Sequence, residues 1–229
     1  MFNKLKTLFE LKTDRIPDVQ DMNELATKGI DLNSLITVDY PLLDLTPSLI
    51  FSLGDKTKKI TGKSSASERG EHTHRFYTED DYFFQFDFFG ENKRENLNRL
   101  AVFSYLLDEG EAIVPGDEAA AARWRQLIED KDTYTYAGQI YQRITSGVLG
   151  GLEVVELVGD DLNTLENNFA VFAREISDDF FEFLIINMEQ EVSVDDDDNV
   201  SGYGDMTATM AIGVSIPHSQ LTVNPNQGK

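Results

Sequence analysis

The feature that most constrains the fold is an aromatic-rich stretch between positions 71 and 90, EHTHRFYTEDDYFFQFDFFG. It has two β-patterned halves, residues 72–77 and 82–89, separated by the acidic residues 78–81. This arrangement predicts a β-hairpin, because aromatic side chains favour a pleated, half-buried surface. Side chains alternate between the faces of a strand. One face of the second half therefore carries Tyr82, Phe84, Phe86 and Phe88. We expect that face to be buried at the centre of the core.

The acidity of the chain limits its partners. The net charge is −21 over 229 residues. Binding to a phosphate backbone needs clustered lysine and arginine, so nucleic acid is excluded as a main partner. The ordinary consequence of such a charge is solubility, and the alternative is that the acidic surface binds cations or a basic protein.

Cysteine is absent from the sequence, which excludes disulfides, thiolate nucleophiles and sulfur-ligated zinc. No apolar run approaches the ~20 residues of a membrane-spanning helix. The N-terminal sequence has no signal-peptide pattern. We therefore expect a cytoplasmic protein, which could also lie at the periphery of the inner membrane.

The first twelve residues, MFNKLKTLFELK, have an amphipathic pattern. The first fifteen residues carry a net charge of +2, so the rest of the chain carries −23. This polarity predicts that the segment docks on a partner protein or on an anionic membrane surface. The docking residues would be Phe2, Lys4, Leu5, Lys6, Leu8 and Phe9. The alternative is a helix packed on its own domain, or a frayed terminus.

The remaining pattern predicts one domain over residues 31–220, preceded by an amphipathic segment and linker (1–30) and followed by a disordered tail (221–229). Short helices or irregular structure are expected over 32–40 and 42–53. Alanine-rich residues 118–130 predict a helix capped by Asp117. Other strands are predicted over 58–64, 97–107, 134–137, 140–145, 152–158, 168–176, 180–194 and 207–216. The predicted class is α+β, a single domain dominated by antiparallel β-sheet with a few flanking helices.

Two histidines form a candidate metal site. His72 and His74 are two positions apart, so on a strand they face the same side. With a carboxylate from Glu79, Asp80 or Asp81 at the turn, they could bind a divalent metal. The alternative is a pair of solvent-facing histidines without a ligand.

A second candidate metal site resembles the opening of a calcium-binding loop. Its oxygen donors would be Asp197, Asn199, Ser201 and Asp205, with Gly202 at the turn position. The twelfth position is Ala208, where such a loop needs a bidentate glutamate. Weak cation binding is one interpretation. The other is a solvated hairpin loop whose charges discourage aggregation.

No catalytic constellation is visible in the sequence. The glycines at 147, 150 and 151 lack the lysine and hydroxyl residue of a phosphate-binding loop, and Ser104 and Ser146 lack a nucleophile-elbow context. We expect Arg75 and Arg143 to pair with carboxylates or to stack on aromatic rings rather than to bind a substrate. Neither a catalytic site nor a cofactor is therefore predicted.

Three short motifs resemble the YjfK-like family of bacterial proteins. They are HRFYTEDD at 74–81, GQIYQR at 138–143 and IGVSIP at 212–217. The helix around Arg123 and Trp124 is also similar, and the resemblance extends over about residues 35–219. The chain departs from it in the polar stretch 55–70 and in the aspartates 195–198.

The YjfK-like family is a domain of unknown function, so the resemblance implies no catalytic residues. Its genes often lie beside genes for a phage-shock-like peripheral membrane protein, a small membrane protein and an ATP-grasp ligase. The resemblance therefore implies a role in a bacterial envelope or stress-response system.

Two hypotheses from different classes follow. The first is a non-catalytic accessory or adaptor protein of such a system, which contacts a protein partner or an anionic membrane surface through residues 1–12 or through an exposed sheet edge. The second is a protein that binds a small molecule or a divalent cation through its acidic loops and the face of His72 and His74. An unrecognised enzyme is the least supported reading.

Overall fold

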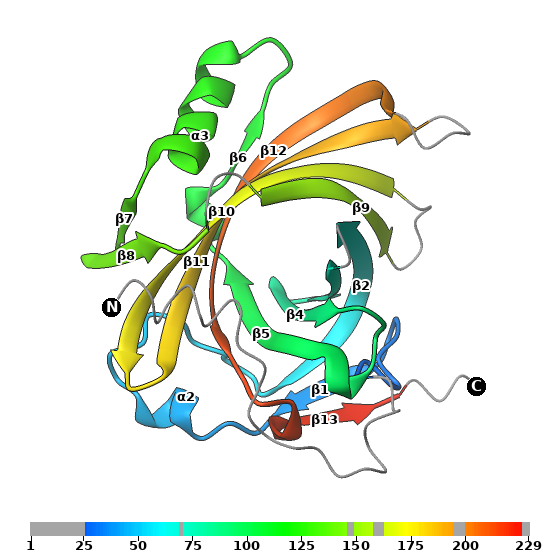
Figure 1. The fold of residues 1–229 in the computed structure, drawn as a ribbon, viewed down its shortest axis with the longest axis vertical. Coiled ribbons are helices and arrows are strands. Elements are labelled where there is room, and N and C mark those ends of the chain that lie inside the picture. Colours follow the sequence, from blue (N-terminus) through cyan, green and yellow to red (C-terminus); the bar gives the residue numbers. More distant parts are fainter. Residues whose placement is uncertain (1–25, 69–70, 146–148, 158–162, 195–199, 226–229) are drawn as a thin grey trace.

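Antiparallel β-sheet dominates the computed structural model, which describes residues 26–68, 71–145, 149–157, 163–194 and 200–225. One series of paired strands closes on itself, because its last member pairs with its first. In order around this closed sheet (Figure 1), the strands are β2 (Thr57–Glu68), β3 (Glu71–Thr78), β4 (Tyr82–Phe89), β5 (Leu97–Tyr105), β12 (Val200–Ser215), β11 (Phe180–Val194), β10 (Asn163–Ser177) and β9 (Leu149–Leu157).

Further strands extend the closed sheet at three places. β1 (Leu35–Val38) pairs with both β2 and β13 (Leu221–Asn224). The hairpin of β7 (Thr133–Tyr136) and β8 (Gln139–Arg143) joins β10. The short β6 (Glu111–Ile113) pairs with β12.

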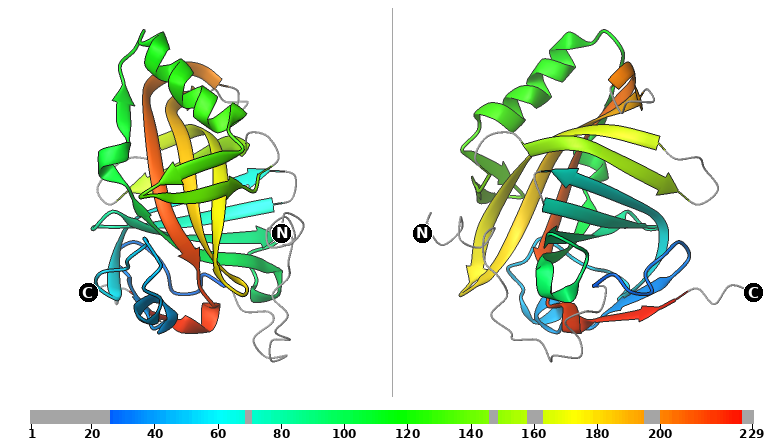
Figure 2. Two further views of the ribbon diagram at one scale, coloured as in Figure 1. Left: turned by 90° about the vertical axis from the view of Figure 1, so that its left-hand side faces the viewer. Right: turned by 45° about the vertical axis from the view of Figure 1, so that its right-hand side comes forward.

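Helices are few in the described part of the chain. α3 (Glu118–Asp130) crosses the outer face of β10 and β11 (Figure 2), and α2 (Leu42–Leu45) lies at the end of the molecule that holds β1 and β13. Three 3₁₀ turns occupy Arg94–Asn96, Leu107–Glu109 and His218–Gln220. No described helix has the length and apolar character needed to cross a membrane.

α3 is held at both ends by side chains. The Asp117 carboxylate accepts a hydrogen bond of 3.0 Å from the Ala120 backbone N–H, as predicted for an N-cap. At the other end the Arg143 guanidinium donates to the backbone carbonyls of Ile128 (2.5 Å) and Lys131 (3.3 Å). Arg143 also lies over the ring of Phe172, so it stacks on an aromatic ring as expected and caps the helix as well.

The predicted hairpin is confirmed as β3 and β4, with Phe76 opposite Phe84. Phe84, Phe86 and Phe88 are buried as expected, and they face outward from the closed sheet into the larger core. Phe83 and Gln85 on the opposite face of β4 are buried too, and Phe83 stacks on Phe103 in the interior with a centroid distance of 5.0 Å. The core therefore lies on both sides of this strand.

Two features correct the sequence interpretation. The molecule is mostly β rather than α+β, because α3 is the one long helix of the described residues. β1 lies where helix or irregular structure was expected, and β13 lies within the predicted disordered tail 221–229. These four-residue strands are too short for a visible period, and they pair with each other with Ile36 opposite Val223.

Candidate functional site

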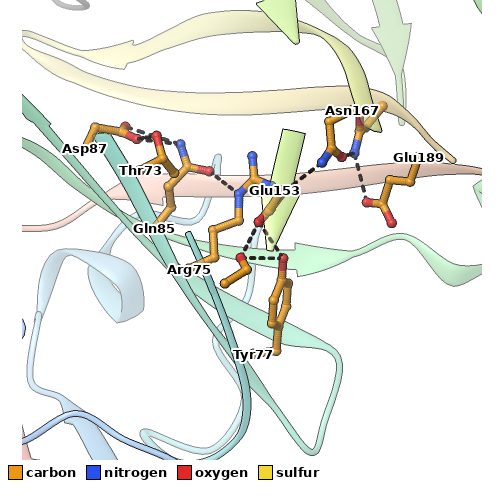
Figure 3. Close-up of polar contacts among 10 residues, drawn as sticks. Thr73, Arg75, Tyr77, Gln85, Asp87, Glu153, Asn167 and Glu189 are labelled. Carbon is orange, nitrogen blue, oxygen red and sulfur yellow. Dashed lines mark hydrogen bonds and ion pairs between the residues drawn. The ribbon is translucent and has the colours of Figure 1, made fainter. Parts of the chain in front are cut away.

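Polar side chains line part of the interior of the closed sheet. We call them the interior cluster: Ser64, Thr73, Arg75, Tyr77, Gln85, Asp87, Arg99, Glu153, Asn167, Asn187 and Glu189. Figure 3 shows most of this cluster. They come from consecutive strands around the sheet, from β11 through β10, β9, β2, β3 and β4 to β5. Members on the same strand are two residues apart, so they face the same side. The rest of the interior is apolar, with Phe83, Phe103, Phe181 and Phe183 among its side chains.

Glu153 of β9 is the centre of the interior cluster, and only 3% of it is exposed. Its carboxylate accepts hydrogen bonds from the Arg75 guanidinium (2.6 Å), the Tyr77 hydroxyl (3.1 Å), the Asn167 amide (2.8 Å) and the Ser64 hydroxyl. A buried carboxylate is stable only when it is paired and hydrogen-bonded in this way.

Arg75 carries the network from Glu153 to β4. Its Nε donates to Gln85 Oε1 at 3.0 Å, and the Gln85 amide donates to Asp87 Oδ1 at 3.0 Å. Asp87 also forms an ion pair of 2.5 Å with Arg99 of β5. Burial acts to lower the pKa of Arg75, but the Glu153 carboxylate together with the nearby Tyr77 and Tyr105 raises it overall, so the guanidinium stays charged.

The other arm of the network runs from Asn167 to β11. The Asn187 amide Nδ2 donates to Asn167 Oδ1 at 2.9 Å and to Glu189 Oε1 at 2.8 Å. Asn187 is 6% exposed, and its own Oδ1 is buried without a donor among the described residues. A buried polar atom that lacks a partner is unusual in a folded protein.

Glu189, at the end of this arm, has a carboxyl group whose pKa is raised above its ordinary value. Burial raises the pKa of Glu189, the Arg75 guanidinium opposes the rise, and the Glu153 carboxylate adds to it. Among the described residues no ion pair to Glu189 is formed. The pKa values of Tyr77 and Tyr105 are also raised, first by burial, so both phenols remain protonated near neutral pH.

A second buried carboxylate lies on the outer face of the sheet. Glu182 is fully buried and accepts hydrogen bonds from the backbone N–H groups of Ile50 (2.7 Å) and Phe51 (2.6 Å), from the Tyr141 hydroxyl (2.6 Å) and from Arg174 (2.7 Å). These donors satisfy both carboxylate oxygens. Glu182 therefore fastens residues 50–51 to the sheet and leaves no group for a ligand.

The predicted histidine site is only partly assembled. His72 and His74 both lie on the outer side of β3, where the His74 ring contacts Phe88 and burial lowers the pKa of His74. The turn carboxylates are at the opposite end of the hairpin, and Asp80 forms an ion pair of 2.5 Å with the buried Lys58. In the described ranges no group of three or more His, Asp or Glu side chains is placed to hold a metal ion.

Parts of the other predicted sites lie outside the described residues. Asp197 and Asn199 of the calcium-like loop are among them, whereas Ser201 and Asp205 are exposed on β12. The Ser201 hydroxyl donates to the Ser193 backbone carbonyl at 3.2 Å, across the hairpin. The docking residues Phe2, Lys4, Leu5, Lys6, Leu8 and Phe9 also lie outside the described residues.

Sequence reasoning expected Arg75 to pair with a carboxylate, and this is confirmed. It missed Glu153, Asn187 and Glu189. A signal for the last two exists in FFEFLIINME (180–189), because the inward positions change from Phe and Ile to Asn and Glu along a single strand. Such a change predicts an interior that is apolar in one part and polar in another.

Comparison with protein families gives one match. A family model described as a protein of unknown function (DUF2491) matches residues 1–222. The chain belongs to this family. Membership in DUF2491 confirms the expectation of a family without an assigned function, and the narrower resemblance to the YjfK-like family stays a prediction. No curated protein and no solved structure matches the chain.

Proposed function

We propose that this protein is a non-catalytic binding protein whose interior cluster holds a small polar molecule. The observation that carries the proposal is a charged, hydrogen-bonded network inside a closed antiparallel sheet. A closed sheet of about eight strands has an interior that is either filled by side chains or just wide enough for one small ligand.

The energetics of burial support a binding role. Ion pairs such as Arg75–Glu153 stabilise a fold no better than apolar side chains of similar volume, because both ions lose their hydration. A stable interior alone would therefore not require them. Polar groups held rigidly by one another are what a binding site for a polar molecule needs.

The contacts of the interior cluster favour binding over catalysis. The Ser64 hydroxyl donates to Glu153, but that carboxylate already accepts hydrogen bonds from Arg75, Tyr77 and Asn167. None of the described histidines belongs to the interior cluster. A nucleophile with an adjacent free base, which acyl transfer requires, is therefore not supported.

Thermal unfolding in the presence of small polar compounds tests the proposal. The panel contains amines, polyols, amino acids and carboxylates, because a ligand that binds only the folded state raises the Tm. We expect at least one class of compound to raise the Tm of the full chain. Most of this increase should disappear in Arg75→Lys, because lysine keeps the positive charge but lacks the planar guanidinium group with its fixed N–H donors. The matched control is Arg125→Lys, on the exposed side of α3.

An unchanged Tm with every class at millimolar concentration would contradict the proposal. An equal increase in the wild type and in Arg75→Lys would place the binding away from the Arg75 guanidinium. Because the Arg75 guanidinium contacts Gln85 and Glu153, circular dichroism of the variant must first show an intact fold.

The second candidate function is that of a cytoplasmic adaptor in a bacterial envelope or stress-response system. The contrast between the basic first fifteen residues and the acidic remainder favours it. A groove of about 200 Å³ between α3 and the sheet offers a contact surface, and its lining combines the apolar Ile128, Met188 and Met206 with charged and polar side chains. Methionine is common at surfaces that accept varied partners.

Sedimentation with anionic and neutral vesicles tests the membrane form of this role. Full-length protein should pellet with the anionic vesicles, and a chain that lacks residues 1–12 should remain in the supernatant. Equal behaviour of the two chains would contradict membrane docking. Capture of partners from the native host with both chains then tests the protein-binding form.

A further inference from the structure

We infer that the ligand of the interior cluster is a small organic cation, whose ammonium group is held by Glu189 and Asn187. This inference rests on the proposed function and specifies its ligand class. It depends on the charge balance of the interior cluster, on an unpartnered acceptor, and on the aromatic side chains beside them.

The charges of the interior cluster do not balance. Arg75 is paired with Glu153 at 2.6 Å, and Arg99 is paired with Asp87 at 2.5 Å. Glu189 is the carboxylate that remains without an ion pair among the described residues. An isolated carboxylate away from bulk water is unfavourable, so the site either takes up a proton or attracts a cation.

Asn187 supplies the unpartnered acceptor. Its Nδ2 donates to both Asn167 Oδ1 and Glu189 Oε1, so its amide cannot be turned around without placing an oxygen against two acceptors. Its Oδ1 is therefore an acceptor by geometry, and no described donor reaches it. The missing partner must be a hydrogen-bond donor. An ammonium group has three donors and no acceptor, so it can contact both residues.

The access of this acceptor limits the size of the ligand. Asn187 Oδ1 is closed off from water, and an incoming group must displace part of the neighbouring wall. Glu189 is only partly buried and is the outer member of the pair. A primary ammonium on a short chain fits this requirement better than a bulky quaternary group.

Aromatic side chains favour an organic cation over a metal ion. Tyr77, Tyr105 and Phe169 are partly buried against the apolar part of the interior. Aromatic faces attract ammonium and guanidinium groups, as the position of Arg75 over Phe169 (6.0 Å) illustrates. Calcium and magnesium instead require about six oxygen ligands, and the described residues do not provide such a set.

Matched compounds test the charge of the ligand. Thermal melts and isothermal titration use propylammonium, 1-propanol and propionate, which share a carbon chain but differ in charge, together with magnesium and calcium chloride. Ionic strength is held constant, because a chain of net charge −21 attracts all cations weakly. We expect propylammonium alone to raise the Tm.

Two variants locate the binding. Glu189→Gln removes the proposed counter-charge, whereas Glu191→Gln removes the same charge from an exposed position on β11. We expect the affinity for propylammonium to fall at least tenfold in Glu189→Gln and to stay unchanged in Glu191→Gln. An equal affinity in Glu189→Gln and the wild type would overturn the inference.

The outcomes separate this inference from the proposed function. If propanol or propionate raises the Tm and propylammonium does not, the interior still binds small molecules but the inferred ligand class is wrong. Stabilisation by magnesium or calcium alone also overturns the ammonium ligand. If no compound of either panel binds, the proposed function itself is wrong.

Discussion

Arg75 on β3 and Glu153 on β9 form an ion pair of 2.6 Å across β2, which lies between their two strands. The pair joins side chains that are 78 positions apart in the sequence. Ser64 of β2 donates to the same carboxylate, so three strands share one charged centre. This centre lies where β2 meets β9 and the sheet closes. The interior cluster therefore has a structural role at the closure as well as its proposed role in binding.

Glu153→Gln should destabilise the fold strongly. The substitution leaves the Arg75 guanidinium buried without its counter-ion, and we expect the free energy of unfolding to fall by about 3 kcal/mol. Urea unfolding measures the change. Glu156→Gln on the same strand is the control, because its ion pair with Lys63 is exposed and should contribute less than about 1 kcal/mol. Equal effects of the two substitutions would contradict the central role of Glu153.

Gly213→Ala should separate β12 from β5. Gly213 pairs with Phe103, and an added Cβ would meet the Val102 carbonyl oxygen and the Phe103 ring closer than van der Waals contact allows. We expect a loss of about 2 kcal/mol in the free energy of unfolding, measured by thermal melts. Gly151→Ala on β9 is the control, because no atom lies within 4 Å of its added Cβ. A Gly213→Ala protein of unchanged Tm would mean that the two strands are farther apart.

Tyr141→Phe should weaken the attachment of residues 50–51 to the sheet. The Tyr141 hydroxyl donates to the fully buried Glu182 carboxylate at 2.6 Å, and a hydrogen bond to a charged group contributes about 2 kcal/mol. Chemical unfolding should show a loss of that size. Tyr134→Phe removes only a contact of 3.8 Å with the sulfur of Met210 and should have a much smaller effect. Equal losses would show that the Glu182 contacts are not the cause.

The stability of the protein should depend on the protonation of Glu189. Burial raises the pKa of this carboxyl above its ordinary value of 4.5. Above pH 4.5 the folded state therefore holds a proton that the unfolded state has released, and the free energy of unfolding falls as the pH rises toward the raised pKa. Urea unfolding should show Glu189→Gln gaining stability relative to the wild type across this window. A difference that is constant with pH would contradict the raised pKa, and Glu191→Gln controls for net charge.

Much of the secondary structure could be predicted from local pattern. The hairpin of β3 and β4 follows from aromatic alternation, and α3 follows from alanine propensity and the Asp117 cap. β1 and β13 could not be predicted, because each has four residues and is stabilised by its partner rather than by its own composition. Propensity is informative only over a longer window.

The candidate site was much less predictable than the strands. The pairing of Arg75 was expected because a buried guanidinium needs a carboxylate, but which carboxylate would meet it was not. The choice of Glu153 depends on β9 joining β2, a contact between distant parts of the chain. The histidines show the converse. Their shared face was predicted correctly, but the carboxylate expected beside them did not join them, because Asp80 forms an ion pair with Lys58.

By itself the sequence determined that strands would dominate and that one face of β4 would be aromatic, because these properties depend on residues close together in the chain, and its composition determined the large negative charge. Only the tertiary structure decided that the sheet closes and that Glu153, Asn187 and Glu189 line part of its interior. The physical reason is that alternation tells which face a side chain occupies, whereas strand order and register decide which faces enclose a common space.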